Sequence, residues 1–431
     1  EAQDLIILAG GYQFIGEWEI AIDLTFKALE RDPNNSRAHL AFIFTFLKRE
    51  QAEGKEPDEK YIKAFQKSIG EFNKRFPEEK ALQGFDVKDN DISQILKMID
   101  QMADVTDNAT NLYKESKAPM AFVPRLTGKK PFDVWAAFTQ MPNVGIKISF
   151  GASDEIKNEL ITLEEYQNRA IVIDIYPLFL LAHLDQLELL PKFFKKIYVH
   201  QTVMDELTET VEDRKISARK GVSVLSRIDG KHRMTDIPPE QIQKTLDLLE
   251  KIRGFISSNS SIEVRGFSKE KPKDERNIIN ALDESTRDSV LLAEELGMPF
   301  YCDDRILRAI VNKDYGLKSF STQTLFVIAH KNNIITLDKK FEIQMKMIDF
   351  YYEFVSIDAT FIFVQLKNAN YRVEDIQNVI FNLVRKETSI QSLSIVLADL
   401  FFILMMDKSV SSPIKVQIFR YILKEAGHNH D

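Results

Sequence analysis

Ala170-Ile-Val-Ile-Asp174, a run of apolar residues that ends in an acid, is the first of four similar motifs in this chain. The others are Val199-His-Gln-Thr-Val-Met-Asp-Glu206, Arg287-Asp288-Ser-Val-Leu-Leu292 and Tyr301-Cys-Asp303-Asp304-Arg305. Each lies where a predicted strand meets a predicted helix. Carboxylates at the carboxyl ends of strands in an α/β sheet can converge in one crevice, where a cluster of them binds a hard divalent cation. The four motifs therefore predict one shared acidic site.

Strands and helices alternate around these motifs. We expect strands at 170–173, 196–199, 263–267, 299–302 and 317–320, and helices at 176–190, from 202, and at 239–256, 276–296, 305–313 and 322–331. Gly297 is a suitable C-cap for the helix before it. Because such alternation is typical of a parallel sheet, residues 169–335 are predicted to form an α/β domain, a parallel twisted sheet flanked by helices.

The region after this domain, residues 336–431, is predicted to be mostly helical. We expect a short strand at 359–363, followed by helices at 374–386, 391–406 and 412–425. Residues 118–168 mix proline, glycine and short apolar runs, with a strand candidate at 144–150. They are interpreted as a connector without an assigned function.

Residues 1–117 are predicted to be all-α. Small residues recur at the spacing of two packed helices, and Asp32-Pro33-Asn34-Asn35 then breaks the second helix. This pattern resembles a tetratricopeptide repeat. We expect one repeat, with a second, degenerate repeat up to Pro77 as an alternative and a further amphipathic helix at 91–117. Such repeats bind protein partners along a concave surface.

The chain begins with Glu1, and a repeat array needs about three stacked units for stability. We therefore expect a piece of a longer protein, with further repeats upstream. The length of 431 residues allows two or three domains with real cores. A single cysteine, Cys302, excludes an internal disulfide and fits a reducing compartment. Because no apolar run is long enough for a bilayer and no signal-peptide pattern is present, we expect a cytoplasmic protein without a membrane partner.

The charge of the chain gives opposing indications about nucleic acid. The net charge of −8 disfavours nucleic-acid binding, because phosphate contacts need local lysine and arginine. The cations are nevertheless clustered around the acidic motifs. Around the second motif, they are Lys192, Lys195 and Lys196 before it and Arg214, Lys215, Arg219 and Lys220 after it. Such clusters are either substrate contacts or solvated helix faces.

The acids of the first two motifs also have structural explanations. Asp174 follows so apolar a stretch that its carboxylate needs a cation or hydrogen-bond donors, although it could also serve as the anion at a helix N-terminus. Asp205 and Glu206 compete as ligands in the second motif. Thr202-x-x-Asp205 has the spacing of a capping box, so Asp205 is interpreted as part of a helix cap, and Thr202 as a cap or a phosphate contact.

The third motif places Asp288 four residues after Glu284, on the same helix face. Like charges at this spacing repel unless a metal ion or an arginine joins them. Asp283 has the spacing of a simple surface ion pair with Arg287. In the fourth motif, one of Asp303 and Asp304 should cap the helix that follows. Candidate phosphate contacts, with surface ion pairing as the alternative, are Arg305 and Arg308.

The four motifs, in this order on these elements, resemble the PIN-like nuclease family, which is similar in plan to the FEN-type 5′ nucleases. The resemblance covers about 170–335. It implies that Asp174, Glu206, Asp288 and Asp304 are the four family acids, catalytic and metal-binding. Asp303 stands where the family often carries an amide or another acid, so the choice between Asp303 and Asp304 as ligand stays open.

Carboxylate and water oxygens are the ligands that Mg²⁺ or Mn²⁺ prefers. One or two such ions activate a water molecule and stabilise the leaving oxygen of a phosphodiester. The resemblance implies RNA as the usual substrate. Its splayed bases could stack on aromatic residues, for which Tyr176, Phe179 and Phe267 are candidates, although all three fit a hydrophobic core.

These residues predict a metal-dependent endoribonuclease. By analogy, we expect a regulated stress, toxin or defence effector within an oligomer or a larger complex. Two alternatives remain at this point. One is a catalytically inactive PIN-like adaptor that binds protein partners, and the other is a nuclease that acts on DNA flaps or nicks. The chain has no Walker loop, no Rossmann glycine fingerprint and no zinc-type Cys/His cluster. His200 is interpreted as a hydrogen-bonded residue at a strand end, and Cys302 as a small buried side chain.

Overall fold

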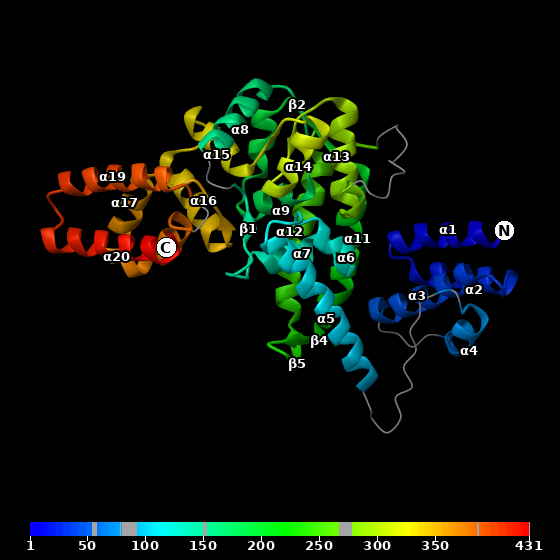
Figure 1. Ribbon diagram of the computed structural model, residues 1–431. Helices are drawn as coiled ribbons and strands as arrows, with labels where there is room; N and C mark the ends of the chain where they lie inside the picture. The colour runs from blue at the N-terminus through cyan, green and yellow to red at the C-terminus, as the bar shows by residue number, and fades with distance from the viewer. Residues whose placement is uncertain are drawn as a thin grey trace. The chain divides into compact units, whose positions relative to one another are not determined.

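The computed structural model describes residues 1–53, 58–77, 79, 93–149, 153–266, 278–385 and 388–430 (Figure 1). The chain forms two compact units. The first unit is Glu1–Gln101 together with Val211–Leu246, and the second is Met102–Thr210 together with Asp247–Asp431. The second unit contains all four acidic motifs and the α/β domain except residues 211–246, which belong to the first unit.

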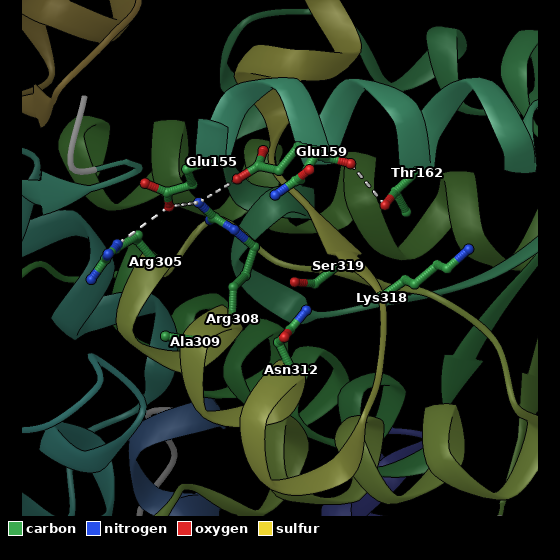
Figure 2. A pocket seen from close by; sticks show the side chains of 10 residues that line it. Glu155, Glu159, Thr162, Arg305, Arg308, Ala309, Asn312, Lys318 and Ser319 are labelled. Carbon is green, nitrogen blue, oxygen red and sulfur yellow. Dashed lines mark hydrogen bonds and ion pairs between the residues drawn. The ribbon is translucent and has the colours of Figure 1, made fainter. Parts of the chain in front are cut away.

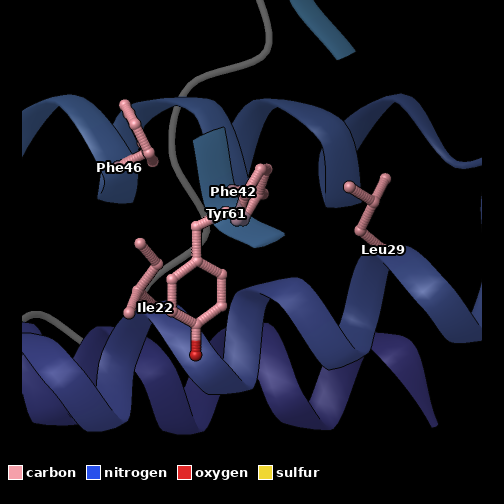
Figure 3. Packing of buried hydrophobic residues seen from close by; sticks show 5 residues of the cluster. All are labelled: Ile22, Leu29, Phe42, Phe46 and Tyr61. Atoms are coloured by element: carbon pink, nitrogen blue, oxygen red, sulfur yellow. The ribbon is translucent and has the colours of Figure 1, made fainter. Parts of the chain in front are cut away.

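The first unit begins with two successive helix pairs. Their members are α1 (Ala2–Phe14), α2 (Trp18–Arg31), α3 (Ser36–Glu53) and α4 (Glu59–Arg75). The predicted breaker after Arg31 separates α2 from α3. Apolar side chains from α2, α3 and α4 pack into one core, as Figure 3 shows for Ile22, Leu29, Phe42, Phe46 and Tyr61. The predicted helical N-terminal region is confirmed, and this shared core explains why its helices pack as pairs.

The first unit also contains a β-hairpin that the sequence analysis missed. Strand β4 (Val222–Ile228) pairs antiparallel with β5 (Lys231–Ile237). The turn residues Asp229 and Gly230 have φ values of 51° and 71°, as the Asp-Gly dipeptide of a tight hairpin turn requires. This dipeptide was the available signal. It was overlooked because the flanking residues are largely polar and exposed, without a clear alternation.

A five-stranded parallel sheet forms the centre of the second unit. Its strand order is β6 (Ile262–Arg265), β3 (Lys196–His200), β2 (Ala170–Ile173), β7 (Phe300–Tyr301) and β8 (Ser319–Phe320). All four pairings are parallel. The predicted fold class is therefore confirmed. Since β2 and β7 are neighbours, the ends of the first and fourth motifs lie side by side.

The helices that join these strands agree with prediction except at their ends. They are α9 (Ile175–His183), α11 (Gln201–Ala218), α12 (Pro239–Ser258), α13 (Glu284–Leu296), α14 (Arg305–Tyr315) and α15 (Thr322–Lys331). The helix predicted from 276 begins at Glu284, because Asp283 caps it, and a short 3-10 turn, Ile278–Ala281, precedes it. Residues 267–277, including Phe267, lie outside the described residues.

The segment interpreted as a connector is part of the second unit. It contains α6 (Phe122–Thr127), α7 (Pro131–Phe138), β1 (Ile146–Lys147) and α8 (Ser153–Tyr166), which follows residues 150–152 outside the described part. Trp135 of α7 donates a hydrogen bond of 2.9 Å to the Tyr352 hydroxyl and packs against Phe179. Strand β1 pairs in parallel with β9 (Tyr352–Glu353). The connector is thus joined to both the α/β domain and the C-terminal region.

The C-terminal region is helical, as predicted. Its helices are α16 (Leu337–Asp349), α17 (Ala359–Asn368), α18 (Gln377–Leu383), α19 (Ile390–Met406) and α20 (Ser412–His430). The strand predicted at 359–363 is wrong, because Asp358 accepts a hydrogen bond of 2.7 Å from the Phe361 amide and starts α17 there. None of the helices within the described residues has the length and apolar character needed to cross a membrane.

Candidate functional site

Asp174 lies at the carboxyl end of β2, where it is the N-cap of α9 and fully buried. Its Oδ1 accepts hydrogen bonds from the Ile175 amide (2.8 Å) and the Thr286 hydroxyl (3.0 Å). The Cys302 thiol donates to its Oδ2 at 3.5 Å. The buried Asp174 carboxylate is therefore accommodated after an apolar strand because it caps a helix and accepts hydrogen bonds from two distant elements.

Asp283 is the neighbour of Asp174 that the sequence analysis did not assign to the site. It caps α13 and accepts hydrogen bonds from the Thr286 amide (3.1 Å) and the Ser285 hydroxyl (2.5 Å). Thr286 thus joins the two acids, with its hydroxyl on Asp174 and its amide on Asp283. The predicted surface pair of Asp283 with Arg287 is wrong, because Asp283 is buried and used as a cap.

Asp304 is the N-cap of α14 at the end of β7, which confirms that one acid of the fourth motif caps this helix. It is fully buried and accepts hydrogen bonds from the amides of Ile306 (2.9 Å) and Leu307 (3.3 Å). Successive side chains of an extended chain point to opposite sides. Accordingly, Asp303 faces away and accepts hydrogen bonds from the Thr322 amide (2.7 Å) and hydroxyl (2.8 Å).

Glu206 is the most accessible acid of the site, with a side chain that is 21% exposed. It lies on α11 and accepts a hydrogen bond of 3.1 Å from the Thr210 hydroxyl. Burial raises its pKa, the Lys130 ammonium and the Thr210 hydroxyl oppose this rise, and the charges of Glu209 and Asp283 add smaller contributions to it. Glu206 therefore lies where the acidic group approaches solvent.

The helix start next to Glu206 differs from the predicted capping box. Helix α11 begins at Gln201, and His200 Nδ1 accepts a hydrogen bond from the Thr202 amide (3.1 Å), so the histidine occupies the capping position. The Thr202 hydroxyl lies 2.8 Å from the same nitrogen. Asp205 accepts from the Gln201 side chain at 2.8 Å. The capping interpretations of Thr202 and Asp205 are thus wrong, whereas the hydrogen-bonded His200 is confirmed.

Burial sets the electrostatics of this group. It raises the pKa of Asp174 to about 8, and the charge of Asp283 adds to the rise. Burial also raises the pKa values of Asp283, Asp304 and Glu206, with Lys130 opposing the effect at Glu206. Asp303, on the opposite side, has a pKa raised to about 6 by burial. The group is therefore short of positive charge, which a bound cation would supply.

The connector covers this acidic group from one side. The Met120 amide donates a hydrogen bond to Asp304 Oδ2, and the Asp283 amide donates to the Ala121 carbonyl at 2.8 Å. Met120 and Ala121 are both fully buried. The Lys130 ammonium forms ion pairs with Glu206 (3.7 Å) and Glu209 (2.5 Å). Residues 120–130 thus contact three of the four acids, and we call these residues the covering segment.

The residue types fit a divalent metal ion, but the described side chains do not form a ready set of ligands. Carboxylate oxygens are the preferred ligands of Mg²⁺ and Mn²⁺. In the part of the chain that the structure describes, however, no group of three or more His, Cys, Asp or Glu side chains is arranged to hold a metal. Amides and hydroxyls donate hydrogen bonds to the carboxylates of Asp174, Asp283 and Asp304 and so orient them. A carboxylate that accepts such bonds keeps further lone pairs with which it can bind a cation.

Comparison with known protein families gives one match. The model of the PIN domain associated with the TPR-GreAB-C-PIN system matches residues 172–313. This segment is a PIN domain. No curated protein and no solved structure matches the chain significantly. PIN domains are typically nucleases and usually bind metal ions. All the acids described above lie within the matched residues, whereas the covering segment lies outside them.

Asp288, which the family resemblance designates as the third acid, lies elsewhere on α13 of the PIN domain. It is buried and forms an ion pair of 2.8 Å with Arg287, which also contacts Glu284 at 3.0 Å. An arginine therefore relieves the predicted repulsion between Glu284 and Asp288. Two residues along an α-helix correspond to a rotation of about 200°. Asp288 thus faces a different side of α13 from Thr286, the residue that joins Asp174 and Asp283.

Arg308, a predicted phosphate contact, is a buried structural residue of the PIN domain. Its guanidinium donates to the carbonyls of Cys302 (3.0 Å), Asp303 (3.0 Å) and Ile148 (2.5 Å), and pairs with Glu159 at 2.8 Å. Arg308 and Glu159 line a polar pocket of about 360 Å³ between α8 and α14 (Figure 2). In this conformation, the guanidinium holds the start of α14 to α8 and presents no face to a phosphate.

We expect Arg308→Ala to destabilise the second unit by about 3–5 kcal/mol, because it leaves a buried Glu159 without its cation. Arg305 provides a matched control on the same helix. Its side chain is 25% exposed and pairs with Glu155 at 3.2 Å, so Arg305→Ala should cost at most about 1 kcal/mol. Urea unfolding followed by circular dichroism measures both changes. Equal losses for the two variants would contradict the structural role of Arg308.

Proposed function

We propose that this chain is a metal-dependent endoribonuclease that hydrolyses RNA phosphodiester bonds at the acidic group of its PIN domain. The observation that supports the proposal is that Thr286 joins the buried acids Asp174 and Asp283, and that one short segment contacts Asp283, Asp304 and Glu206. Buried carboxyls with raised pKa values are costly for a fold to keep, and they cluster at functional sites. Membership of a nuclease family makes phosphodiester hydrolysis the chemistry that best accounts for this cost.

The side chains divide the work as follows. Asp174, Asp283 and Asp304 supply hard oxygen ligands from three helix starts, and Thr286 fixes the first two relative to each other. Glu206 supplies the ligand nearest to solvent, where a substrate phosphate arrives. Mg²⁺ or Mn²⁺, when bound, would activate a water molecule and neutralise the phosphate charge. Thr202 and Arg305 are proposed phosphate contacts, and substitution of Asp288 and Asp303 tests whether either joins this set of ligands.

We propose that the conformation described here is a closed form of the site. The Met120 amide of the covering segment donates to the Asp304 carboxylate, its Ala121 carbonyl accepts from the Asp283 backbone amide, and its Lys130 ammonium provides the positive charge next to Glu206. A metal ion would compete with the Met120 amide for Asp304 and with Lys130 for Glu206. We therefore propose that the enzyme is regulated, with a signal that moves the covering segment. This property suits a stress, toxin or defence effector that must stay inactive until it is needed.

The helical N-terminal region gives such a signal a place to act. The matching family is named for a system that joins TPR, GreAB-C and PIN parts. We propose that the helix pairs of the first unit bind a protein partner and that the protein works in the cytoplasm as part of a larger complex. The low cysteine content of the sequence, a single residue without an internal disulfide partner, supports this location.

Cleavage assays with matched oligonucleotides test the function. Single-stranded and hairpin RNA, and DNA of the same sequences including flap and nicked forms, are incubated with Mn²⁺, with Mg²⁺ or with EDTA. We expect metal-dependent cleavage of RNA and none in EDTA. Cleavage of the DNA flaps or nicks alone would identify the alternative DNA nuclease. If calorimetry detects no metal binding and the assays detect no cleavage, the second candidate, an inactive adaptor, is favoured. The hydrogen-bonded carboxylates of the site already agree with this alternative.

A further inference from the structure

Helix α19 leaves an apolar surface uncovered. Apart from Gln391, two serines and Asp399, its residues are apolar on every side, and helices of this kind are normally buried all round. The buried side chains of α19 are Leu393, Leu400 and Leu404, which lie on one face. Its exposed large side chains are Ile390, Ile395, Phe401, Phe402, Met405 and Met406. An exposed patch of this extent marks an interaction site.

Part of this surface forms a groove between α19 and α20, which lie side by side in Figure 1. The groove has a volume of about 690 Å³. Phe401 and Met405 line it from α19, one helical turn apart, and Val416, Phe419 and Leu423 line it from α20. The rings of Phe401 and Phe419 meet edge to face at 5.3 Å, so they join the two walls. The groove is therefore an apolar hollow between two helical walls.

The charged residues that line the groove are all cations. They are Lys415, Arg420 and Lys424, all on α20. On a helix, Lys415 lies on one side of the stripe formed by Val416, Phe419 and Leu423, and Arg420 and Lys424 lie on the other side. The Lys415 ammonium also donates to the Met405 carbonyl at 3.3 Å, across the groove. The apolar groove therefore has a positive rim on both sides of its α20 wall.

We infer that this groove binds an amphipathic α-helix of a partner protein, with an apolar stripe flanked by glutamate or aspartate. A third helix laid between two others buries side chains at i, i+3, i+4 and i+7 against both of them. Its flanking carboxylates would then meet the cations of the rim. Charge complementarity of this kind selects the partner more than it adds affinity.

The same observations disfavour two other occupants. A second copy of the groove would bring three cations against three cations, which costs free energy at an interface. A membrane surface attracts cations and apolar side chains, but it favours a convex helix face that can sink into the headgroups. Such a surface leaves the hollow of the groove unfilled. The groove and its charges thus fit an acidic helix best, and this inference is independent of the nuclease proposal.

Binding of synthetic peptides to the full chain tests the inference. Three peptides of about 18 residues, five helical turns, share one leucine stripe and carry glutamate flanks, lysine flanks or a scrambled order. Fluorescence anisotropy measures their affinities. We expect the glutamate-flanked peptide to bind at least about 10-fold more tightly than the lysine-flanked one, a difference of about 1.4 kcal/mol, and the scrambled peptide not to bind.

Substitutions in the groove provide the matched controls. Combined Lys415→Glu, Arg420→Glu and Lys424→Glu should reverse the preference in favour of the lysine-flanked peptide. Lys408→Glu, an exposed residue of the loop before α20 that does not line the groove, should leave it unchanged. Leu423→Ser should weaken both peptides at least about 10-fold. Leu423 is 57% exposed, so this variant should fold normally.

Three outcomes would overturn the inference. The first is equal binding of glutamate- and lysine-flanked peptides, and the second is an unchanged preference in the triple variant. The third is evidence that something other than an acidic helix fills the groove. A dimer in sedimentation that Leu423→Ser dissociates would identify a second copy of the chain, and stronger binding to vesicles containing phosphatidylserine than to any peptide would identify a membrane.

Discussion

Asp174→Asn should reduce RNA cleavage at least about 100-fold, because the site loses a charged ligand at its most buried position. The protein should nevertheless fold, since asparagine can still accept hydrogen bonds from the Ile175 amide and the Thr286 hydroxyl. The variant should also melt at a higher temperature than the wild type in EDTA. The folded-state pKa of Asp174 is about 8, far above its ordinary value of 3.8.

The sign of this stability effect is defined by the raised pKa. The favourable contribution of the protonated Asp174 is fully present below pH 3.8 and is lost as the pH rises towards 8. Asparagine does not ionise. The difference in melting temperature between variant and wild type should therefore grow from pH 5 to pH 8 and become constant above. Differential scanning fluorimetry across this range provides the measurement, and a variant less stable at pH 8 than the wild type would count against it.

Parallel substitutions decide which residue is the third acid. If Asp283 is the functional neighbour of Asp174, Asp283→Asn should lower cleavage far more than Asp288→Asn at equal folded fraction. Asp288 is held by Arg287, so its loss should affect stability more than the chemical step. The reverse order would restore the assignment that the family resemblance implies.

Met120→Ala should open the site. This substitution removes a fully buried side chain that holds the covering segment, and it should cost about 2–5 kcal/mol locally. The amide of residue 120 then leaves Asp304 more often, and a carboxylate becomes available to the metal. We expect the affinity for Mn²⁺, measured by calorimetry, to rise at least about 10-fold and cleavage at limiting metal to rise with it.

Met347→Ala provides the matched control. Met347 is also almost fully buried, but it lies on α16, in the C-terminal region. It should destabilise the second unit by a similar amount without changing the affinity for metal. Equal metal affinities of wild type, Met120→Ala and Met347→Ala, with cleavage intact, would show that the covering segment does not control the site. Absent cleavage in all three, with metal bound, would instead count against the nuclease itself.

The sequence predicted the sheet and the positions of its acids well, because both follow from local patterns. A short apolar run followed by an acid and a helix is a local signal, and it located Asp174 and Asp304 correctly. The role of Asp283 depends on Thr286 reaching Asp174 across the sheet, a contact between residues 112 positions apart that no local pattern reveals. For the same reason, spacing alone favoured a surface pair with Arg287.

The sequence did not predict the contacts between the connector and the acidic group, for a related reason. Proline and glycine at 118–131 are typical of a loop, and they do break the helices there. The function of this segment depends on the tertiary contacts of Met120 and Ala121 with acids more than 150 residues away. The strand predicted at 359–363 failed because the buried side chains Phe361, Ile362 and Leu366 also fit a helix, and the cap at Asp358 decides between the two.

The chain carries a natural reporter of its own opening. Cys302 is the sole thiol of the sequence, it is fully buried, and burial raises its pKa well above the ordinary value. Its thiol donates hydrogen bonds to the Asp174 carboxylate at 3.5 Å and to the Asp304 carbonyl at 3.8 Å. A disulfide reagent such as Ellman's compound should therefore modify the protein only at the rate at which this interior becomes accessible. The rate of labelling would then measure how often the site opens, without any engineered probe.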